Sequence, residues 1–135
     1  VLSRGLGDVY KRQDVTIVAT GHLVWESIEA AKILNQSGIS AEVINIHTIK
    51  PLDEKIILES VSKTKCIVSA EEHNYLGGLG ESISRVLSKN MPLPQEFVAT
   101  KDTFGESGTP AELMKKYGLN SDSIVEKVKK VINRK

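Results

Sequence analysis

The stretch CIVSAEEHNYLGGLGE, residues 66–81, combines an apolar run, a polar segment and a glycine-rich turn. Residues 66–70 are mostly apolar, which is typical of a strand that is buried inside a parallel sheet. After the glycines, apolar side chains recur at helical spacing, at Leu79, Ile83, Val86 and Leu87. This spacing predicts a helix that begins near Gly78 or Gly80, so the glycines form a strand-to-helix turn.

The same order of strand and helix repeats on both sides of this stretch. Short apolar runs rich in β-branched residues predict strands at residues 15–19, 41–46 and 96–99. Apolar residues at helical spacing predict helices at residues 23–36, 53–63 and 121–132. A capping box at Thr109 predicts a further short helix that ends at Gly118. This alternation predicts an α/β fold, a three-layer α/β/α domain with a mostly parallel sheet of four to five strands.

The N-terminal segment does not fit this pattern. Residues 1–13 show no sustained period, and two glycines flank Leu6, so the segment favours neither a helix nor a strand. We therefore expect residues 1–13 to be a non-native or disordered leader and residues 14–135 to form the domain.

The composition excludes several classes of function. The chain has 135 residues and a formal net charge of +1, so bulk charge gives no attraction to nucleic acid or to an anionic membrane. Its single cysteine, Cys66, lies in an apolar run, which favours a buried inert thiol over a nucleophile. No apolar run approaches the ~20 residues that cross a bilayer, and no signal peptide is recognisable. We expect a cytoplasmic protein.

The carboxylates and the histidine after the third predicted strand invite an acid–base role, but the arrangement is incomplete. Glu71 and Glu72 are adjacent, so in a strand they point to opposite faces and cannot act as a facing pair. We expect them to form a solvated strand end. His73 could act as a general base only if a carboxylate oriented it, and a hydrogen-bonded turn residue is the simpler interpretation.

Other polar residues also follow predicted strands, where ligands of α/β sheets usually bind. They include Gly21-His22, His47-Thr48 and Lys101-Asp102. No close pair of histidines or cysteines has the spacing of a metal site, so we predict no metal ligand. Ser107 does not lie in the Gly-x-Ser-x-Gly context of a nucleophile elbow. We expect Ser107 to lead into the capped helix at Thr109 rather than to act as a nucleophile.

The glycine-rich turn is a candidate anion site. Free amide groups and the dipole at a helix start favour an anion. However, residues 77–80 lack the lysine and the serine or threonine of a P-loop, and their spacing is not that of the dinucleotide fingerprint. The candidate residues for anion binding or for an interface are therefore His73, Gly77, Gly78 and Gly80.

Three long segments, in this order, resemble the C-terminal domain of transketolase. They are DVTIVATGHLVWESIEAAKILNQSGISAEVINIHTIKPLD, CIVSAEEHNYLGGLGESISRVL and EFVATKDTFGESGTPAELMKKYGL. The resemblance runs from Asp14 to the end of the chain. Related domains occur in deoxyxylulose-phosphate synthase and in the beta chains of 2-oxoacid dehydrogenases, but TIKPLD and DTFGESG are most similar to transketolase, particularly the split kind whose C-terminal half is a separate polypeptide.

The resemblance implies that the intact enzyme is a thiamine-diphosphate-dependent transferase of the pentose phosphate pathway, which moves a two-carbon ketol unit between sugar phosphates. It implies that thiamine diphosphate and a divalent metal, Mg²⁺, are held by two other domains, one for the diphosphate and one for the pyrimidine. The Gly-Asp-Gly and Asn motif that holds the metal and the diphosphate in the family is absent from this sequence. The domain alone is then expected to bind no cofactor and to be inactive.

The resemblance also implies partners for the domain. We expect it to pack against the pyrimidine-binding domain and to support a homodimer or a heterotetramer, with His73 bonded locally or facing the neighbouring domain. In the family, a strand before the position of Asp14 pairs antiparallel with the first parallel strand. Residues 1–13 replace that strand here, and Val9 and Tyr10 could pair only partly, which predicts an unpaired sheet edge. A missing interface should leave an apolar patch exposed.

Two alternatives of other classes remain open from the residues alone. The first is a regulatory module that binds an anion or a nucleotide at the helix start of residues 77–80. The second is a small hydrolase built on His73 and Ser107, although no third orienting group can be named for it.

Overall fold

The computed structural model describes residues 3–4, 13–21, 23–46, 53–74, 78–100 and 121–135. Their elements are β1 (Ser3–Arg4), β2 (Val15–Ala19), α1 (Leu23–Gln36), β3 (Ala41–Asn45), α2 (Glu54–Thr64), β4 (Ile67–Asn74), α3 (Leu79–Asn90), β5 (Gln95–Thr100) and α5 (Ser121–Asn133). These bounds confirm the strands and helices predicted in the described ranges, within a few residues at their ends. The helix predicted between Thr109 and Gly118 lies outside the described residues.

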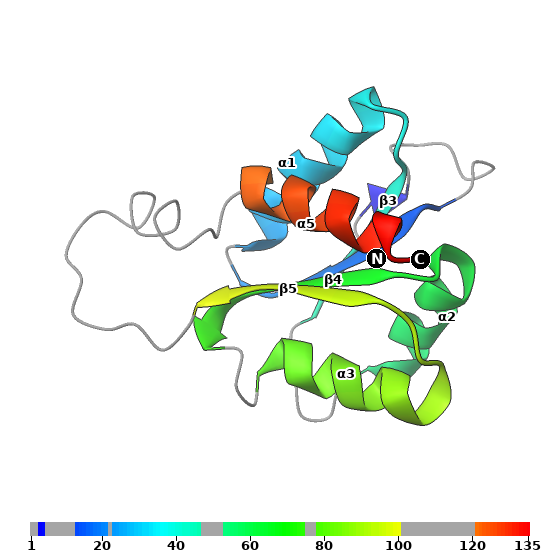
Figure 1. The fold of residues 1–135 in the computed structure, drawn as a ribbon. Coiled ribbons are helices and arrows are strands. Elements are labelled where there is room, and N and C mark those ends of the chain that lie inside the picture. Colours follow the sequence, from blue (N-terminus) through cyan, green and yellow to red (C-terminus); the bar gives the residue numbers. More distant parts are fainter. Residues whose placement is uncertain (1–2, 5–12, 22, 47–52, 75–77, 101–120) are drawn as a thin grey trace.

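The strands form one mixed sheet in the order β1-β3-β2-β4-β5. The strands β3, β2, β4 and β5 run parallel to one another, and β1 is antiparallel to β3. Helices cover both faces of this sheet: α1 and α5 lie on one side, and α2 and α3 lie on the other (Figure 1). The predicted three-layer, mostly parallel α/β/α fold is therefore confirmed.

The edge of β3 is paired with β1 at two positions, which corrects the prediction of an unpaired sheet edge there. Ser3 lies opposite Val43 and Arg4 lies opposite Glu42, so β1 adds to the outer edge of β3 and not to β2, the first parallel strand. Both edges of β2 are already paired, one with β3 and one with β4, so β2 has no edge left to accept a further strand. Val9 and Tyr10 lie outside the described residues.

Each face of the sheet carries its own apolar core. The core under α1 and α5 includes Val15, Ile17 and Ala19 of β2, and the core over α2 and α3 includes Val18 of the same strand. This alternation follows from the period of two in a strand, since neighbouring side chains point to opposite faces. Both faces of β2 are buried, which explains why its sequence is a continuous apolar run.

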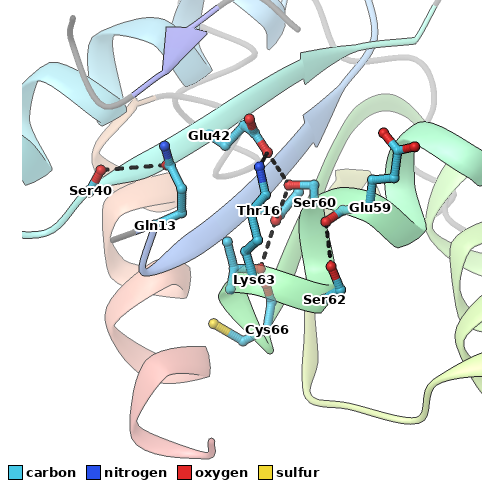
Figure 2. Close-up of polar contacts among 10 residues, drawn as sticks. Gln13, Thr16, Ser40, Glu42, Glu59, Ser60, Ser62, Lys63 and Cys66 are labelled. Atoms are coloured by element: carbon cyan, nitrogen blue, oxygen red, sulfur yellow. Dashed lines mark hydrogen bonds and ion pairs between the residues drawn. The ribbon is translucent and has the colours of Figure 1, made fainter. Parts of the chain in front are cut away.

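A buried polar cluster interrupts the second core at Thr16, where β2 meets α2. The Oγ1 atom of Thr16 lies 2.7 Å from Oγ of Ser60 and 2.8 Å from Oγ1 of Thr64. Ser60 also donates to the buried carboxylate of Glu42, and Nζ of Lys63 lies 3.9 Å from that carboxylate. Figure 2 shows these side chains converging from β2, β3 and α2. The cluster satisfies the polar atoms of Thr16 and Glu42 internally.

The C-terminal residue ties the end of α5 to the start of the domain. Nζ of Lys135 donates to the backbone oxygen of Asp14 at 2.8 Å and to that of Thr64 at 2.9 Å. Thr64 is the last residue of α2, where an unpaired carbonyl group attracts a cation. Asp14, α2 and the end of α5 therefore meet at one place on the amino side of the sheet.

Candidate functional site

The candidate site lies where β4 ends and α3 begins. The strand β4 continues to Asn74, four residues beyond the predicted end at Ala70. Glu71 therefore stands inside a strand, on the same face as Ser69 two residues earlier. That face carries α3, as Ile67 of β4 packs in the same core as Leu79 and Ile83.

The Glu71 carboxylate binds the first turn of α3. Its Oε1 atom accepts a hydrogen bond from the amide of Leu79 at 2.9 Å, and Oε2 accepts one from the amide of Gly80 at 2.7 Å. The first amide groups of a helix have no partner within the helix, and a negative charge beside them is favourable. The N-cap residue, Gly78, has no side chain to supply such a partner, so Glu71 supplies it from the neighbouring strand.

The prediction of a solvated strand end is wrong for Glu71. Only 1% of this residue is exposed. Burial of a carboxylate is costly unless hydrogen bonds compensate, and here two charge-assisted hydrogen bonds do so. The partners are backbone amide groups, which side-chain patterns in a sequence do not reveal.

Gly80 is glycine because the helix lies very close to the sheet. A Cβ atom at this position would lie 2.4 Å from Cδ2 of Phe97 in β5 and 2.9 Å from Oγ of Ser69 in β4. Real Cβ atoms essentially never approach other heavy atoms so closely. The absence of a side chain at Gly80 therefore allows α3 to pack closely against β4 and β5.

A side-chain network fixes the same turn from β5. Nε2 of Gln95 donates to the backbone oxygen of Gly80 at 3.0 Å and to Oγ of Ser69 at 3.4 Å. Oγ of Ser84 lies 3.0 Å from that backbone oxygen and 2.7 Å from Oε1 of Gln95. Two side chains thus hold the first turn of α3. Glu71 binds the backbone amide groups of Leu79 and Gly80, and Gln95 binds the backbone carbonyl group of Gly80.

The structure brings together only part of the predicted candidate set. Gly78 is the N-cap of α3 in an extended conformation, and Gly80 stands in the first turn. His73 lies within β4, whereas Gly77 lies outside the described residues. Gly21 is described and has a positive φ of 58°, whereas the remaining candidates lie outside the described residues, namely His22, His47, Thr48, Lys101, Asp102 and Ser107.

The described residues show neither a cluster of metal ligands nor a membrane-spanning helix. In the part of the chain that the structure describes, no three histidine, cysteine, aspartate or glutamate side chains gather as metal ligands would. None of the described helices is long and apolar enough to cross a membrane.

Comparisons with known proteins agree on one family. The family model for the transketolase C-terminal domain matches residues 8–124. The 6-deoxy-6-sulfo-D-fructose transketolase subunit of Clostridium sp. (strain MSTE9) is 44% identical over 90% of this chain, and the putative transketolase C-terminal section of Methanocaldococcus jannaschii is 41% identical over 86%. A solved structure, "Split gene transketolase, inactive beta4 tetramer", is 42% identical over 93% of the chain with a TM-score of 0.88.

The matched segment is only part of each of these proteins. This chain covers 38% of the Clostridium relative, 36% of the Methanocaldococcus relative and 41% of the chain in the solved structure. More than half of each relative therefore lies outside the segment that this chain matches.

Proposed function

The chain belongs to the transketolase C-terminal domain family, and we propose that it serves as the non-catalytic C-terminal part of a thiamine-diphosphate-dependent transferase. That enzyme moves a two-carbon ketol unit between sugar phosphates, in the cytoplasm and within the pentose phosphate pathway. The observation that carries the non-catalytic role is the contact of Glu71 with the start of α3.

The described residues do not fit the diphosphate of the cofactor. The start of α3 is the place where the sequence offers an anion site, but the amide groups of Leu79 and Gly80 already bind the Glu71 carboxylate. A diphosphate would have to displace this buried carboxylate and would be repelled by it. We therefore propose that thiamine diphosphate and Mg²⁺ bind to other domains of the enzyme, which correspond to the parts of the relatives outside the matched segment.

The same contact weakens the alternative of an anion- or nucleotide-binding module. Such a module would use the amide groups of residues 77–80, and those of Leu79 and Gly80 have an internal anionic partner. We therefore prefer the transketolase proposal.

Packing and assembly are the positive role that we propose for the chain. The length that the relatives carry beyond the matched segment supports an enzyme in which other domains bind the cofactor. We propose that this domain packs against the pyrimidine-binding domain and supports a homodimer or a heterotetramer. The solved relative is named as a tetramer, which supports an assembly of several subunits.

Two measurements test the proposal. In calorimetry, the chain alone should show no saturable binding of thiamine diphosphate in the presence of Mg²⁺. In a chimera, this chain replaces the matched segment of the Clostridium subunit, and ketol transfer is assayed together with the other polypeptide of that enzyme. The chimera should retain transfer, whereas the same subunit with the segment deleted should not. Tight cofactor binding by the chain alone, or a folded and assembled chimera without activity, would contradict the proposal.

A further inference from the structure

The outer face of α1 carries the large apolar side chains that remain exposed among the described residues. Trp25 is 68% exposed and Ile33 is 39% exposed. Trp25 is the single tryptophan of the chain. Both residues belong to α1. In the sheet and in the other helices, by contrast, the described hydrophobic residues are buried or partly buried.

The geometry of α1 directs Trp25 away from the core. Leu23, Ser27 and Leu34 are fully buried and mark the inner face of the helix. Trp25 follows Leu23 by two residues, which corresponds to a rotation of about 200° around the helix axis. The first core of the domain is thus complete without Trp25, and α1 packs against α5 through other residues.

The outer face of α1 has the composition of an interface. Between Trp25 and Ile33, Nζ of Lys32 lies 3.5 Å from Oε1 of Glu29, so a charged pair separates the two apolar side chains. Interfaces combine a few large apolar or aromatic anchors with polar surroundings, and tryptophan is enriched among the residues that dominate binding. Trp25 is mostly exposed and belongs to neither core, so a partner that covers it would give this tryptophan a role.

The lengths of the relatives favour a further domain of the same enzyme, rather than a second copy of the chain, as the partner that covers this surface. The relatives carry more than half of their length outside the matched segment, which provides such a domain. An exposed apolar patch is also what the resemblance to one domain of a longer enzyme predicts.

We propose that the outer face of α1, defined by Trp25, Glu29, Lys32 and Ile33, docks the cofactor-binding part of the same enzyme, with Trp25 as its anchor. This inference rests on the proposed function, because it takes as the occupant the cofactor-binding part of the enzyme that lies outside the segment matched by this chain. It adds the surface and the anchoring residue, neither of which follows from family membership.

Hydroxyl-radical footprinting with peptide mass spectrometry tests the docking directly. The oxidation rate of Trp25 is measured in the chain alone and in the chimera with the Clostridium subunit described above. Burial should lower the rate in the chimera by about tenfold or more, given the exposure that an anchoring residue loses. Peptides that keep the same oxidation rate in both proteins serve as the internal reference.

A matched pair of variants separates docking from folding. Trp25→Lys should leave the melting temperature of the chain alone nearly unchanged, because the side chain is exposed there. In the chimera it should lower the melting temperature by several degrees, whereas Lys89→Ala, an exposed change on α3, should lower it in neither protein.

The outcomes distinguish this inference from the proposed function. An active chimera in which Trp25 is oxidised as fast as in the chain alone overturns the inference and leaves the function standing. Protection of Trp25 in the chain alone, together with a dimer in sedimentation, also overturns it, because the occupant is then a second copy. An inactive chimera in which Trp25 is protected contradicts the proposed function but supports the docking surface.

Discussion

The carboxylate of Glu71 accepts a hydrogen bond from the amide of Gly80 at 2.7 Å, across nine residues of sequence. Glu71, which lies inside β4, thereby supplies the anion that the start of α3 attracts. The contact joins strand and helix in one buried unit, since Glu71 is 1% exposed. The partial positive charge at the start of α3 is therefore balanced inside the domain by the Glu71 carboxylate.

Glu71→Gln should destabilise the domain. The amide group of glutamine offers one acceptor oxygen, so one of the two amide donors in α3 loses its partner and both lose the charge. We expect a loss of about 2–4 kcal/mol in the free energy of unfolding, measured by urea denaturation. Glu54→Gln in the first turn of α2 is the control, since Glu54 is exposed and its loss should cost about 0.5 kcal/mol.

Glu71→Ala should create a site for an external anion. The truncated side chain leaves the amide groups of Leu79 and Gly80 without their carboxylate, and a small anion can take its place. We expect formate to raise the melting temperature of Glu71→Ala progressively with concentration, beyond any effect on the unmodified chain. An equal shift in both proteins would show that the amide groups stay closed to solvent.

Gly80→Ala should destabilise the domain through a steric clash with Phe97. The added Cβ atom would lie 2.4 Å from the ring, so we expect a loss of about 1–3 kcal/mol in unfolding free energy. Combining it with Phe97→Ala should cost less than the sum of the two single changes. Gly38→Ala separates backbone strain from a steric clash. A Cβ atom at Gly38 would have no atom within 4 Å, so the cost of this change comes only from the backbone, which has a φ of +80°.

Ser27→Ala should leave the domain as stable or make it more stable. The hydroxyl group of Ser27 is buried in α1 and has no hydrogen-bond partner among the described residues. Removing an unsatisfied polar group and introducing a better helix former should gain about 0.5–1 kcal/mol, measured by urea denaturation. Ser60→Ala should do the opposite, because the Ser60 hydroxyl contacts Thr16 and Glu42. A large loss in Ser27→Ala would reveal a partner for its hydroxyl.

The stability of the domain should fall at alkaline pH because of Cys66. Burial raises the pKa of its thiol above the ordinary value of 9.0, an effect that Asp14 reinforces and Lys135 opposes. The unfolded chain therefore loses this proton first as the pH rises through 9.0, which favours unfolding. Between about pH 8 and pH 10, the unmodified chain should lose more unfolding free energy than Cys66→Ala, by up to about 1.4 kcal/mol per pH unit.

The spacing of hydrophobic residues predicts most of this fold, because the side chains that are buried in each strand and helix determine that spacing. The strand of residues 15–19 and the helix of residues 23–36 have the bounds that their apolar patterns predict. The strand β4 extends further than predicted because Glu71 is polar yet buried, and its partners are amide groups of the backbone. A carboxylate placed eight or nine residues before a glycine-led helix start is the signal that could have indicated this contact.

The pairing of β1 was harder to predict for a related reason. The hydrogen bonds of a sheet edge involve the backbone, so Ser3 and Arg4 need no apolar pattern to lie beside β3. The polar cluster around Thr16 was also not predicted, because its members come from three separate elements. Local patterns thus indicate the elements, whereas contacts between distant polar groups require the structure.

The contact between Lys135 and the backbone of Asp14 has a consequence for how this domain can be connected. Because the two residues meet on the amino side of the sheet, a short glycine-rich linker could join them in a domain that lacks residues 1–13 and with them β1. The chain could then be opened elsewhere, for instance between Gln36 and Ala41, where α1 gives way to β3. Such a circularly permuted domain should fold with nearly unchanged thermal stability. This result would show that the fold does not depend on the order in which its elements follow one another along the chain.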